Sequence, residues 1–380
     1  MRLAFLSIGR HIHTERWIRW FAARGHDCHL LTVQPGPIEG VAVHDITTAG
    51  PGKPWRYWRS LGRVRRLLAD LQPDLLNTHF LTGYGYWGDW SGFHPNVLTV
   101  WGDDVYVTPF ENPVKRWLAR RALASCDALT GDSVDILRVA CRELGADPRR
   151  AYRVLWGVDH GVFRPAVATE RRSAFGFGAD DVVYFSPRSY TQPYYNIDVV
   201  IEAAARVRER EPRARFLFAG YEGDPAPFEA LVARAGLDGA ATVVGRIPHG
   251  EFAATINACD VFISVPSVDA TAVSLLEAMS CGKAVIVSSL ASALEWVTDG
   301  ETGRVVPPRD VDQLATAMLE YGARPDRRRA HGTAALARAR TEFGFEANMA
   351  LVDRIFTSLV DARADWPESA SLEALGGGAR

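Results

Sequence analysis

Short apolar runs alternate with helical patterns along most of the chain. Leu3–Ile8 is apolar over the length of one strand, and the next segment carries Trp17, Ile18 and Phe21 at helical spacing. In Trp55–Leu71, apolar residues recur three or four positions apart, which predicts an amphipathic helix. Strands that alternate with helices indicate βαβ units and a mostly parallel sheet covered on both faces.

The alternation breaks once, after Trp156, and restarts at a strand predicted over Val182–Ser186. The pattern therefore predicts two doubly wound α/β domains in tandem, facing across a cleft where ligands of such folds bind. The predicted parts are an N-terminal domain over 1–160, a linker over 161–180, a C-terminal domain over 181–343, a closing helix over 344–365 that crosses back toward the N-terminal domain, and a flexible tail over 366–380.

Length and composition agree with two globular domains. The chain has 380 residues, and a domain has about 150. With 47% hydrophobic and 23% charged residues it has an average globular composition, which excludes wholesale disorder, a collagen-like fibre and a coiled coil. The formal net charge of -2 argues against a general nucleic-acid binder, which carries a basic excess.

The cysteines and the N-terminus indicate the compartment. Five cysteines are widely spaced, without a Cys-x-x-Cys pair, as expected of free thiols in a reducing compartment. The first apolar run, of about six residues, is too short for a signal peptide. We expect a cytoplasmic protein, with peripheral contact at the inner membrane face as an open alternative.

Lysine is scarce: only Lys53, Lys115 and Lys283 occur among the 43 basic residues. A GC-rich genome explains such a bias. The functional alternative is that any phosphate site here depends on Arg, backbone N–H groups and helix ends.

Residues 264–289 carry the densest candidate chemistry. A predicted strand ends at Val265, a loop carries Asp269, and a helix begins near residues 271–273, where its backbone N–H groups can bind an anion. Glu277 lies in the apolar part of this helix, where a lone acid is costly without a partner. A helix-capping Asp269 and a solvated Glu277 are the structural alternative.

This stretch resembles the nucleotide-sugar motif of retaining GT-B glycosyltransferases of family 4 (glycosyl transferases group 1): a Glu, seven residues, then Glu-Ala-Met. LLEAM matches, while Asp269 replaces the first Glu and Ala284 replaces a usual Pro. Weaker similarities follow in order along nearly the whole chain: FAARGHDCHLLT (21–32), LQPDLLNTHF (71–80), TVWGDDVY (99–106), RVLWGVDHGVFRP (153–165), FLFAGYEGD (216–224), VVGRIPHGE (243–251) and LEWVTDGETGRVVPPRD (294–310).

The resemblance implies transfer of a sugar from a nucleotide diphosphate sugar to an alcohol acceptor, with retention and without metal or cofactor. Arg188 matches the Arg that meets the donor diphosphate, whereas the Lys usual five or six residues later falls on Pro193 or Tyr194. The expected catalytic residues are Asp269, Arg188 and His79. The expected donor-side residues are Arg188, Gly220, Arg246, Ile247, Asp269, Ala270, Thr271, Ala272, Val273 and Glu277. The expected acceptor-side residues are Gly9, Arg10, His13, Arg16, Trp101 and Asp104.

Several alternatives stay open. His79 fits a structural, hydrogen-bonded role as well as a catalytic one. The basic helix over 55–68 fits a solvated outer face, an anionic membrane surface or an acidic acceptor. For the whole protein, the alternatives to a transferase are a nucleotide-sugar epimerase or phosphorylase of the same fold, and a non-catalytic nucleotide-sugar binder.

Overall fold

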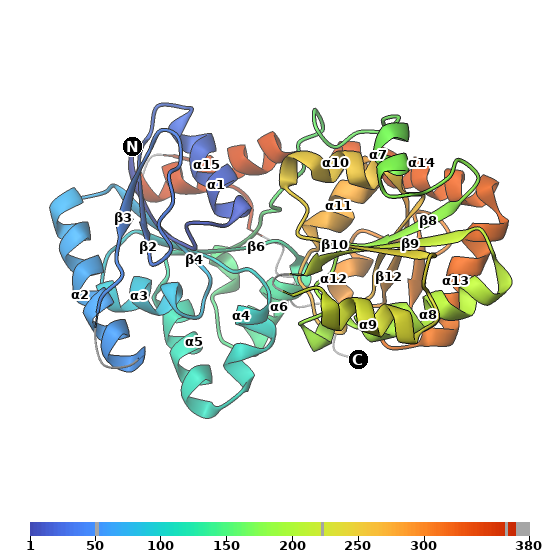
Figure 1. The fold of residues 1–380 in the computed structure, drawn as a ribbon. Helices are drawn as coiled ribbons and strands as arrows, with labels where there is room; N and C mark the ends of the chain where they lie inside the picture. Colours follow the sequence, from blue (N-terminus) through green and yellow to red (C-terminus); the bar gives the residue numbers. More distant parts are fainter. Residues whose placement is uncertain (50–52, 222–223, 362–363, 370–380) are drawn as a thin grey trace. The chain divides into compact units, whose positions relative to one another are not determined.

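The computed structural model describes residues 1–49, 53–221, 224–361 and 364–369, with backbone alone for 53–57 and 221. The chain divides into two compact units, one formed by Met1–Trp156 with Glu346–Arg380 and the other by Gly157–Phe345. Each unit contains one sheet with helices on both of its faces (Figure 1). The predicted fold class, two doubly wound α/β domains, is confirmed.

The first unit, unit 1, contains a seven-stranded sheet in the order β3-β2-β1-β4-β5-β6-β7. Every pair of neighbouring strands in it is parallel. The strands are β1 (Arg2–Leu6), β2 (Asp27–Thr32), β3 (Val41–Asp45), β4 (Leu75–His79), β5 (Asn96–Thr99), β6 (Ala128–Gly131) and β7 (Ala151–Arg153). The helices are α1 (Ile12–Ala22), α2 (Lys53–Leu71), α3 (Tyr84–Ser91), α4 (Asp103–Tyr106), α5 (Pro113–Ser125), α6 (Val134–Arg142) and α15 (Phe345–Val360).

The second unit, unit 2, contains a six-stranded parallel sheet in the order β10-β9-β8-β11-β12-β13. The strands are β8 (Val182–Ser186), β9 (Ala214–Tyr221), β10 (Ala241–Gly245), β11 (Val261–Ser264), β12 (Ala284–Ser288) and β13 (Arg304–Val306). The helices are α7 (Thr169–Ala174), α8 (Ile197–Arg210), α9 (Ala226–Arg234), α10 (His249–Ala258), α11 (Val273–Ser280), α12 (Ala291–Leu294), α13 (Val311–Ala323) and α14 (Pro325–Glu342).

The segment over 161–180 is not a free linker but part of unit 2. It contains helix α7, and Arg172 on that helix donates to Asp260 Oδ2 at 3.0 Å and to Ala258 O at 2.9 Å. These bonds attach the segment to the end of α10 and the start of β11. The hydrogen bonds of one guanidinium can thus fix a segment that has no helical repeat of apolar residues. Hydrophobic periodicity does not reveal such bonds.

Helix α15, predicted as the closing helix over 344–365, packs within unit 1. The Phe356 ring stacks on Phe21 of α1 with centroids 5.1 Å apart, and Trp20 Nε1 donates to Glu346 at 2.8 Å. Of the tail over 366–380, residues 370–380 lie outside the described residues.

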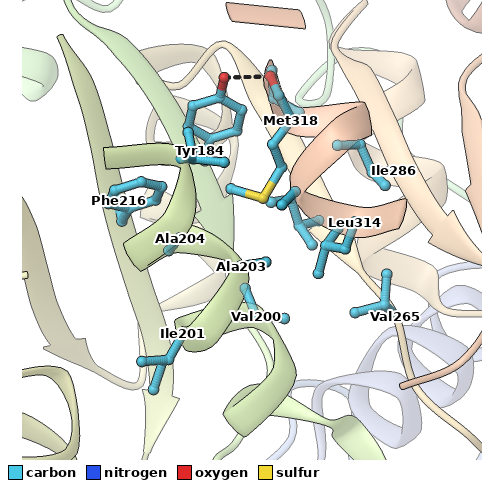
Figure 2. Close-up of a cluster of buried hydrophobic side chains, with 14 of the residues drawn as sticks. Tyr184, Val200, Ile201, Ala203, Ala204, Phe216, Val265, Ile286, Leu314 and Met318 are labelled. Carbon is cyan, nitrogen blue, oxygen red and sulfur yellow. Dashed lines mark hydrogen bonds between the residues drawn. The ribbon is translucent and has the colours of Figure 1, made fainter. Parts of the chain in front are cut away.

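A large apolar cluster holds β8 in place, and β8 leads into the candidate site. Figure 2 shows α8 and α13 packed side by side over the sheet, with Val200 and Met318 between them. The Tyr184 hydroxyl donates to Met318 O at 2.7 Å, which satisfies the polar atom of this buried ring (Figure 2). Packing and this hydrogen bond therefore hold β8 against α13.

Helix α2 confirms the amphipathic pattern predicted over 55–71. Leu61, Val64 and Leu68 are buried against unit 1, while Arg63 and Arg66 are exposed. The side chain of Arg56 lies outside the described residues. No helix in the described ranges is both long and apolar enough to cross a bilayer.

Candidate functional site

Each sheet has one place where the strand order reverses, and ligands of doubly wound folds bind at the carboxyl ends of the strands there. In unit 2 the reversal lies between β8 and β11, and in unit 1 between β1 and β4. Arg188 follows β8 and Asp269 follows β11. These two residues, 81 positions apart, meet at the switch point of unit 2.

Arg188 is held on three sides. Its Nη2 forms an ion pair with Asp269, its Nε donates to Ser264 Oγ at 3.0 Å, and its guanidinium lies 4.8 Å from the centroid of the Tyr195 ring. The side chains of Arg188 and Asp269 are only 13% and 21% exposed. Burial lowers the pKa of Arg188, but the Asp269 carboxylate and the Tyr195 phenol outweigh burial and raise it overall. The sequence predicted both residues individually and did not reveal their direct pairing.

Tyr195 lies next to Pro193 and Tyr194, the two positions on which the family's phosphate-binding Lys falls. The sequence analysis did not single it out. Pro193–Tyr195 form a single 3₁₀ turn that ends at Asn196, whose φ of 54° leads into α8. Asn196 is fixed by Nδ2, which donates to Val265 O at 2.9 Å and to Ser267 Oγ at 2.8 Å. This turn presents Tyr195, rather than Pro193 or Tyr194, to Arg188. The only signal in the sequence was a Tyr adjacent to the positions considered.

Glu277 is buried rather than solvated. It lies on α11 with 4% of its surface exposed, and its Oε1 lies 3.4 Å from His249 Nε2 at the start of α10. A polar partner offsets the cost of burying a carboxylate. His249 is a second residue that the sequence analysis missed, because nothing in the spacing indicates that α10 meets α11 at this point.

Two side-chain hydrogen bonds fix the loop before α11. Ser292 Oγ donates to Asp269 O at 2.8 Å, and Trp296 Nε1 donates to Thr271 Oγ1 at 3.2 Å. Helix α11 begins at Val273, and its N-cap residue Ala272 offers no side-chain cap to the first-turn N–H groups. Ala270 is buried beside them. These N–H groups can therefore bind an anion next to Arg188.

The other donor-side candidates follow the neighbouring strands β9 and β10. Gly220 has a φ of 88°, and a Cβ there would lie 2.5 Å from Pro187 O, so only glycine fits. Arg246 and Ile247 follow β10, exposed and half-buried respectively. The β8–β9 strand ends are thus closely packed, and β10 lies one strand further from Arg188.

His79 closes β4 at the switch point of unit 1 and is fully buried. Its Nε2 lies 2.8 Å from Asn77 Oδ1, which also accepts from Trp17 Nε1 at 3.1 Å. Because an amide oxygen only accepts, His79 Nε2 carries the proton and Nδ1 keeps a lone pair. Burial first, and then His11, lower the pKa of His79 to about 3. In this conformation His79 is a neutral, inward-facing ring rather than an exposed proton acceptor.

Rings from several loops gather around His79. His13 stacks on Trp156 with centroids 4.8 Å apart, and Trp101 meets Trp156 edge-on at 4.9 Å and His11 edge-on at 4.8 Å. We call this set the ring cluster. Its members are His11, His13, Trp17, His79, Trp101 and Trp156.

Asp104 shapes the loop that carries Trp101 rather than facing a ligand. It is fully buried, and its carboxylate accepts from the N–H groups of Leu81 at 2.6 Å, Gly102 at 2.7 Å and Trp101 at 3.0 Å. Burial raises its pKa to about 6 despite these bonds. Asp104 therefore acts on Trp101 through the backbone.

Gly9, Arg10 and Arg16 surround the start of α1. A Cβ on Gly9 would lie 2.4 Å from Gln34 O, so this buried turn requires glycine. Arg10 is exposed and its Nε donates to Pro35 O at 3.1 Å, and Arg16 is half-buried. Within the described ranges, no three His, Cys, Asp or Glu side chains come together in a way that could hold a metal ion.

Comparison with protein families agrees with this site. The model described as "Glycosyl transferase 4-like" matches residues 2–133, and the model described as "Glycosyl transferases group 1" matches residues 169–338. Together the two models match most of both units, including the strand ends described above.

Curated relatives and solved structures point the same way. A D-inositol 3-phosphate glycosyltransferase of Kribbella flavida is 30% identical, over 62% of this chain and 57% of its own length. A D-inositol 3-phosphate glycosyltransferase 2 of Catenulispora acidiphila is 26% identical, over 87% of this chain and 81% of its own length. Among solved structures, sucrose-phosphate synthase from Thermosynechococcus elongatus has a TM-score of 0.81 at 19% identity, covering 95% of this chain and 100% of its own.

A structure of Anabaena HepE in complex with UDP and glucose also has a TM-score of 0.81, at 17% identity, covering 94% of this chain and all of its own. At these identities the solved structures establish the fold, and the family models establish the group. The chain therefore belongs to the group 1 glycosyl transferases and has the GT-B fold of two Rossmann-like units.

Proposed function

We propose that the protein is a retaining glycosyltransferase that moves a sugar from a nucleotide diphosphate sugar to an alcohol acceptor. The observation that carries the proposal is the Arg188–Asp269 pair at the switch point of unit 2, beside the uncapped start of α11. The complex of Anabaena HepE with UDP-glucose and the names of the curated relatives support a nucleotide sugar donor.

In this proposal Arg188 and the first N–H groups of α11 bind the donor diphosphate. The bond between the anomeric carbon and the diphosphate oxygen breaks, and its electron pair stays on the diphosphate. The acceptor hydroxyl oxygen bonds to the same face of the anomeric carbon, and its proton goes to the leaving phosphate oxygen. Negative charge grows on the diphosphate as the bond breaks, so cationic and N–H donors stabilise the transition state more than the ground state.

The two carboxylates take separate roles. Asp269 accepts hydrogen bonds from hydroxyls of the donor sugar, and Glu277 accepts from the ribose. His249, 3.4 Å from Glu277, orients that carboxylate. Because Asp269 is paired with Arg188, donor binding exchanges this ion pair for an Arg188–phosphate contact, and the Asp269 carboxylate then accepts from the sugar.

We further propose that the reaction needs neither metal nor cofactor and takes place in the cytoplasm. The exposed arginines of α2, with Trp58 56% exposed and stacked on Trp90, are a surface for peripheral contact with an anionic membrane. Co-flotation with phosphatidylglycerol vesicles tests this contact. Binding should be lost in Arg63→Glu/Arg66→Glu and should be absent for phosphatidylcholine vesicles.

The main experiment is a thermal-shift screen across UDP, GDP, ADP and TDP sugars, followed by nucleotide release with alcohol acceptors and NMR of the anomeric configuration. Transfer that is retained in EDTA and lost in Arg188→Gln supports the proposal. Arg210→Gln, on the exposed face of α8, is the matched control. Donor conversion without an acceptor would indicate an epimerase, dependence on inorganic phosphate a phosphorylase, and binding without release a non-catalytic protein.

A further inference from the structure

A small niche in unit 2 lies beside Asp269, and the proposed reaction leaves it unassigned. The niche lies between the carboxyl ends of the neighbouring strands β11 and β12 and the starts of helices α11 and α12. It has room for about one group the size of a methyl or a water molecule. The side chains that shape it include those of Asp269, Ala272, Leu275, Val287, Leu290 and Ala293.

The niche has a buried floor and an accessible rim. Leu275 on α11 and Val287 on β12 are 2% and 1% exposed. Ala272 and Ala293, by contrast, are only half-buried, and the side chain of Asp269 is 21% exposed. A ligand that lies against the rim can therefore place one small group onto the floor.

The three serine hydroxyls in the lining of the niche already have protein partners. Ser288 Oγ and Ser292 Oγ each donate to a backbone carbonyl of the loop before α11, at 2.6 and 2.8 Å respectively. Ser264 Oγ accepts from Arg188 Nε at 3.0 Å. A water molecule in such a space needs about two to four polar partners, and these hydroxyls are engaged elsewhere. The niche therefore suits an apolar group better than it suits water.

The niche lies next to the groups that hold the donor in the proposed function. Asp269, on its rim, is the carboxylate that accepts from hydroxyls of the donor sugar. Ala272, also on its rim, is the N-cap residue of α11, whose first N–H groups bind the diphosphate. A sugar held between these two groups therefore lies within reach of the niche.

We propose that the niche binds a methyl group of the donor sugar, so that the donor carries either an acetamido sugar or a 6-deoxy sugar. This proposal rests on the proposed function, because it names the class of the first substrate of that reaction. Both kinds of sugar have a methyl group close to a hydrogen-bond donor, the amide N–H or the 4-hydroxyl, from which Asp269 accepts. The hydroxymethyl group of an ordinary hexose would instead bury a hydroxyl where the hydroxyls of the lining are already engaged, which is unfavourable.

The test is calorimetric titration of the intact protein with three donors that share the nucleoside diphosphate found in the thermal-shift screen. The three donors carry glucose, N-acetylglucosamine and 6-deoxyglucose. One of the two donors with a methyl group should bind about tenfold more tightly than the glucose donor, because an apolar pocket discriminates by about this factor for one such group. The donor that binds more tightly identifies the source of the methyl group.

Variants that fill or open the niche assign the preference to it. Ala293→Val fills the niche and should abolish the preference, while binding of the glucose donor stays within about threefold of wild type. Leu290→Ala removes part of the wall and should reduce the preference to about threefold or less. Ala291→Val, at an exposed position of the same helix α12, is the matched control and should keep the preference. Circular dichroism checks that each variant is folded.

Equal or tighter binding of the glucose donor by the wild type would overturn the methyl niche, and so would a preference that survives in either folded niche variant. Nucleotide release with alcohol acceptors, measured on the same proteins, separates this proposal from the proposed function. Transfer without a donor preference would leave the proposed function standing. The preference without transfer from any donor would support the niche and overturn the proposed function, and failure of all three donors to bind would overturn both.

Discussion

Asp269→Asn is the most informative single change, because it separates the binding of diphosphate from the recognition of sugar. The substitution keeps the size of the side chain and removes the charge that pairs with Arg188. In the wild type, a phosphate competes with this carboxylate for the guanidinium. In the variant, Arg188 keeps Ser264 Oγ at 3.0 Å and loses its ionic competitor.

The magnitude follows from the burial of the pair. A hydrogen bond to a charged group contributes about 1.5–3 kcal/mol, and the 13% and 21% exposure of the two side chains places this pair at the lower end. Free nucleoside diphosphate should therefore bind about tenfold more tightly to Asp269→Asn. The same variant should lose about a hundredfold in kcat/KM for transfer, because a neutral amide replaces a charged acceptor of sugar hydroxyls.

The assay is calorimetric titration with the nucleoside diphosphate found in the thermal-shift screen and with the corresponding nucleotide sugar. Asp312→Asn is the matched control, since Asp312 pairs with Arg206 at the outer surface of the same unit, with 89% exposure. That exchange should change neither affinity. Weaker or unchanged binding of the free diphosphate by Asp269→Asn would refute the idea that the carboxylate and the phosphate compete for Arg188.

Three further predictions test other parts of the two sites. Glu277→Gln should raise donor KM about tenfold or more, because the ribose loses a charged acceptor, and initial-rate kinetics measure the change. Gly220→Ala should destabilise the protein by more than about 2 kcal/mol in urea unfolding, whereas Gly239→Ala, with a φ of 68° and nothing within 4 Å of its Cβ, should cost about 1 kcal/mol. His79 has its folded-state pKa lowered to about 3, so its contribution to stability is lost as pH falls from 6.5 toward 3. Between pH 7.5 and pH 5 the unfolding free energy of the wild type should therefore fall by about 2 kcal/mol relative to His79→Gln, and parallel pH profiles would contradict this.

The sequence predicts most of the fold because the buried strands are continuous apolar runs. It misses β3 and β13, each of which is one of the two edge strands of its sheet. In β3 the burial pattern is mixed, with His44 half-buried and Asp45 exposed, so no apolar run marks the strand. An edge strand pairs with one neighbouring strand and has solvent on its other side. Its sequence therefore mixes apolar and polar residues and shows no continuous apolar run.

The candidate site divides in the same way. Arg188, Asp269 and Glu277 could be proposed from the motif resemblance, since Arg188 and Asp269 follow predicted strands and Glu277 lies on a predicted helix. Their partners could not, because Tyr195 and His249 reach them from other loops and helices. Asn77 shows the same limit: its position was evident in the sequence, while its role in orienting His79 depends on bonds to β5.

The scarcity of lysine affects the candidate phosphate site at Arg188, where the family's Lys is absent. Where the resemblance places a second cation for the diphosphate, this chain presents the Tyr195 ring, and the Arg188 guanidinium is paired with Asp269. In the proposed function, a diphosphate that binds Arg188 replaces the ion pair between Arg188 and Asp269. The net Coulombic gain is therefore small. In the proposed function, the exchange separates the Asp269 carboxylate from Arg188 when the phosphate binds. A ligand that carries both a diphosphate and sugar hydroxyls uses both halves of the separated pair, whereas a nucleoside diphosphate uses one. In the proposed function, the Arg188–Asp269 pair thereby favours the complete donor over its product, which is the direction that turnover requires.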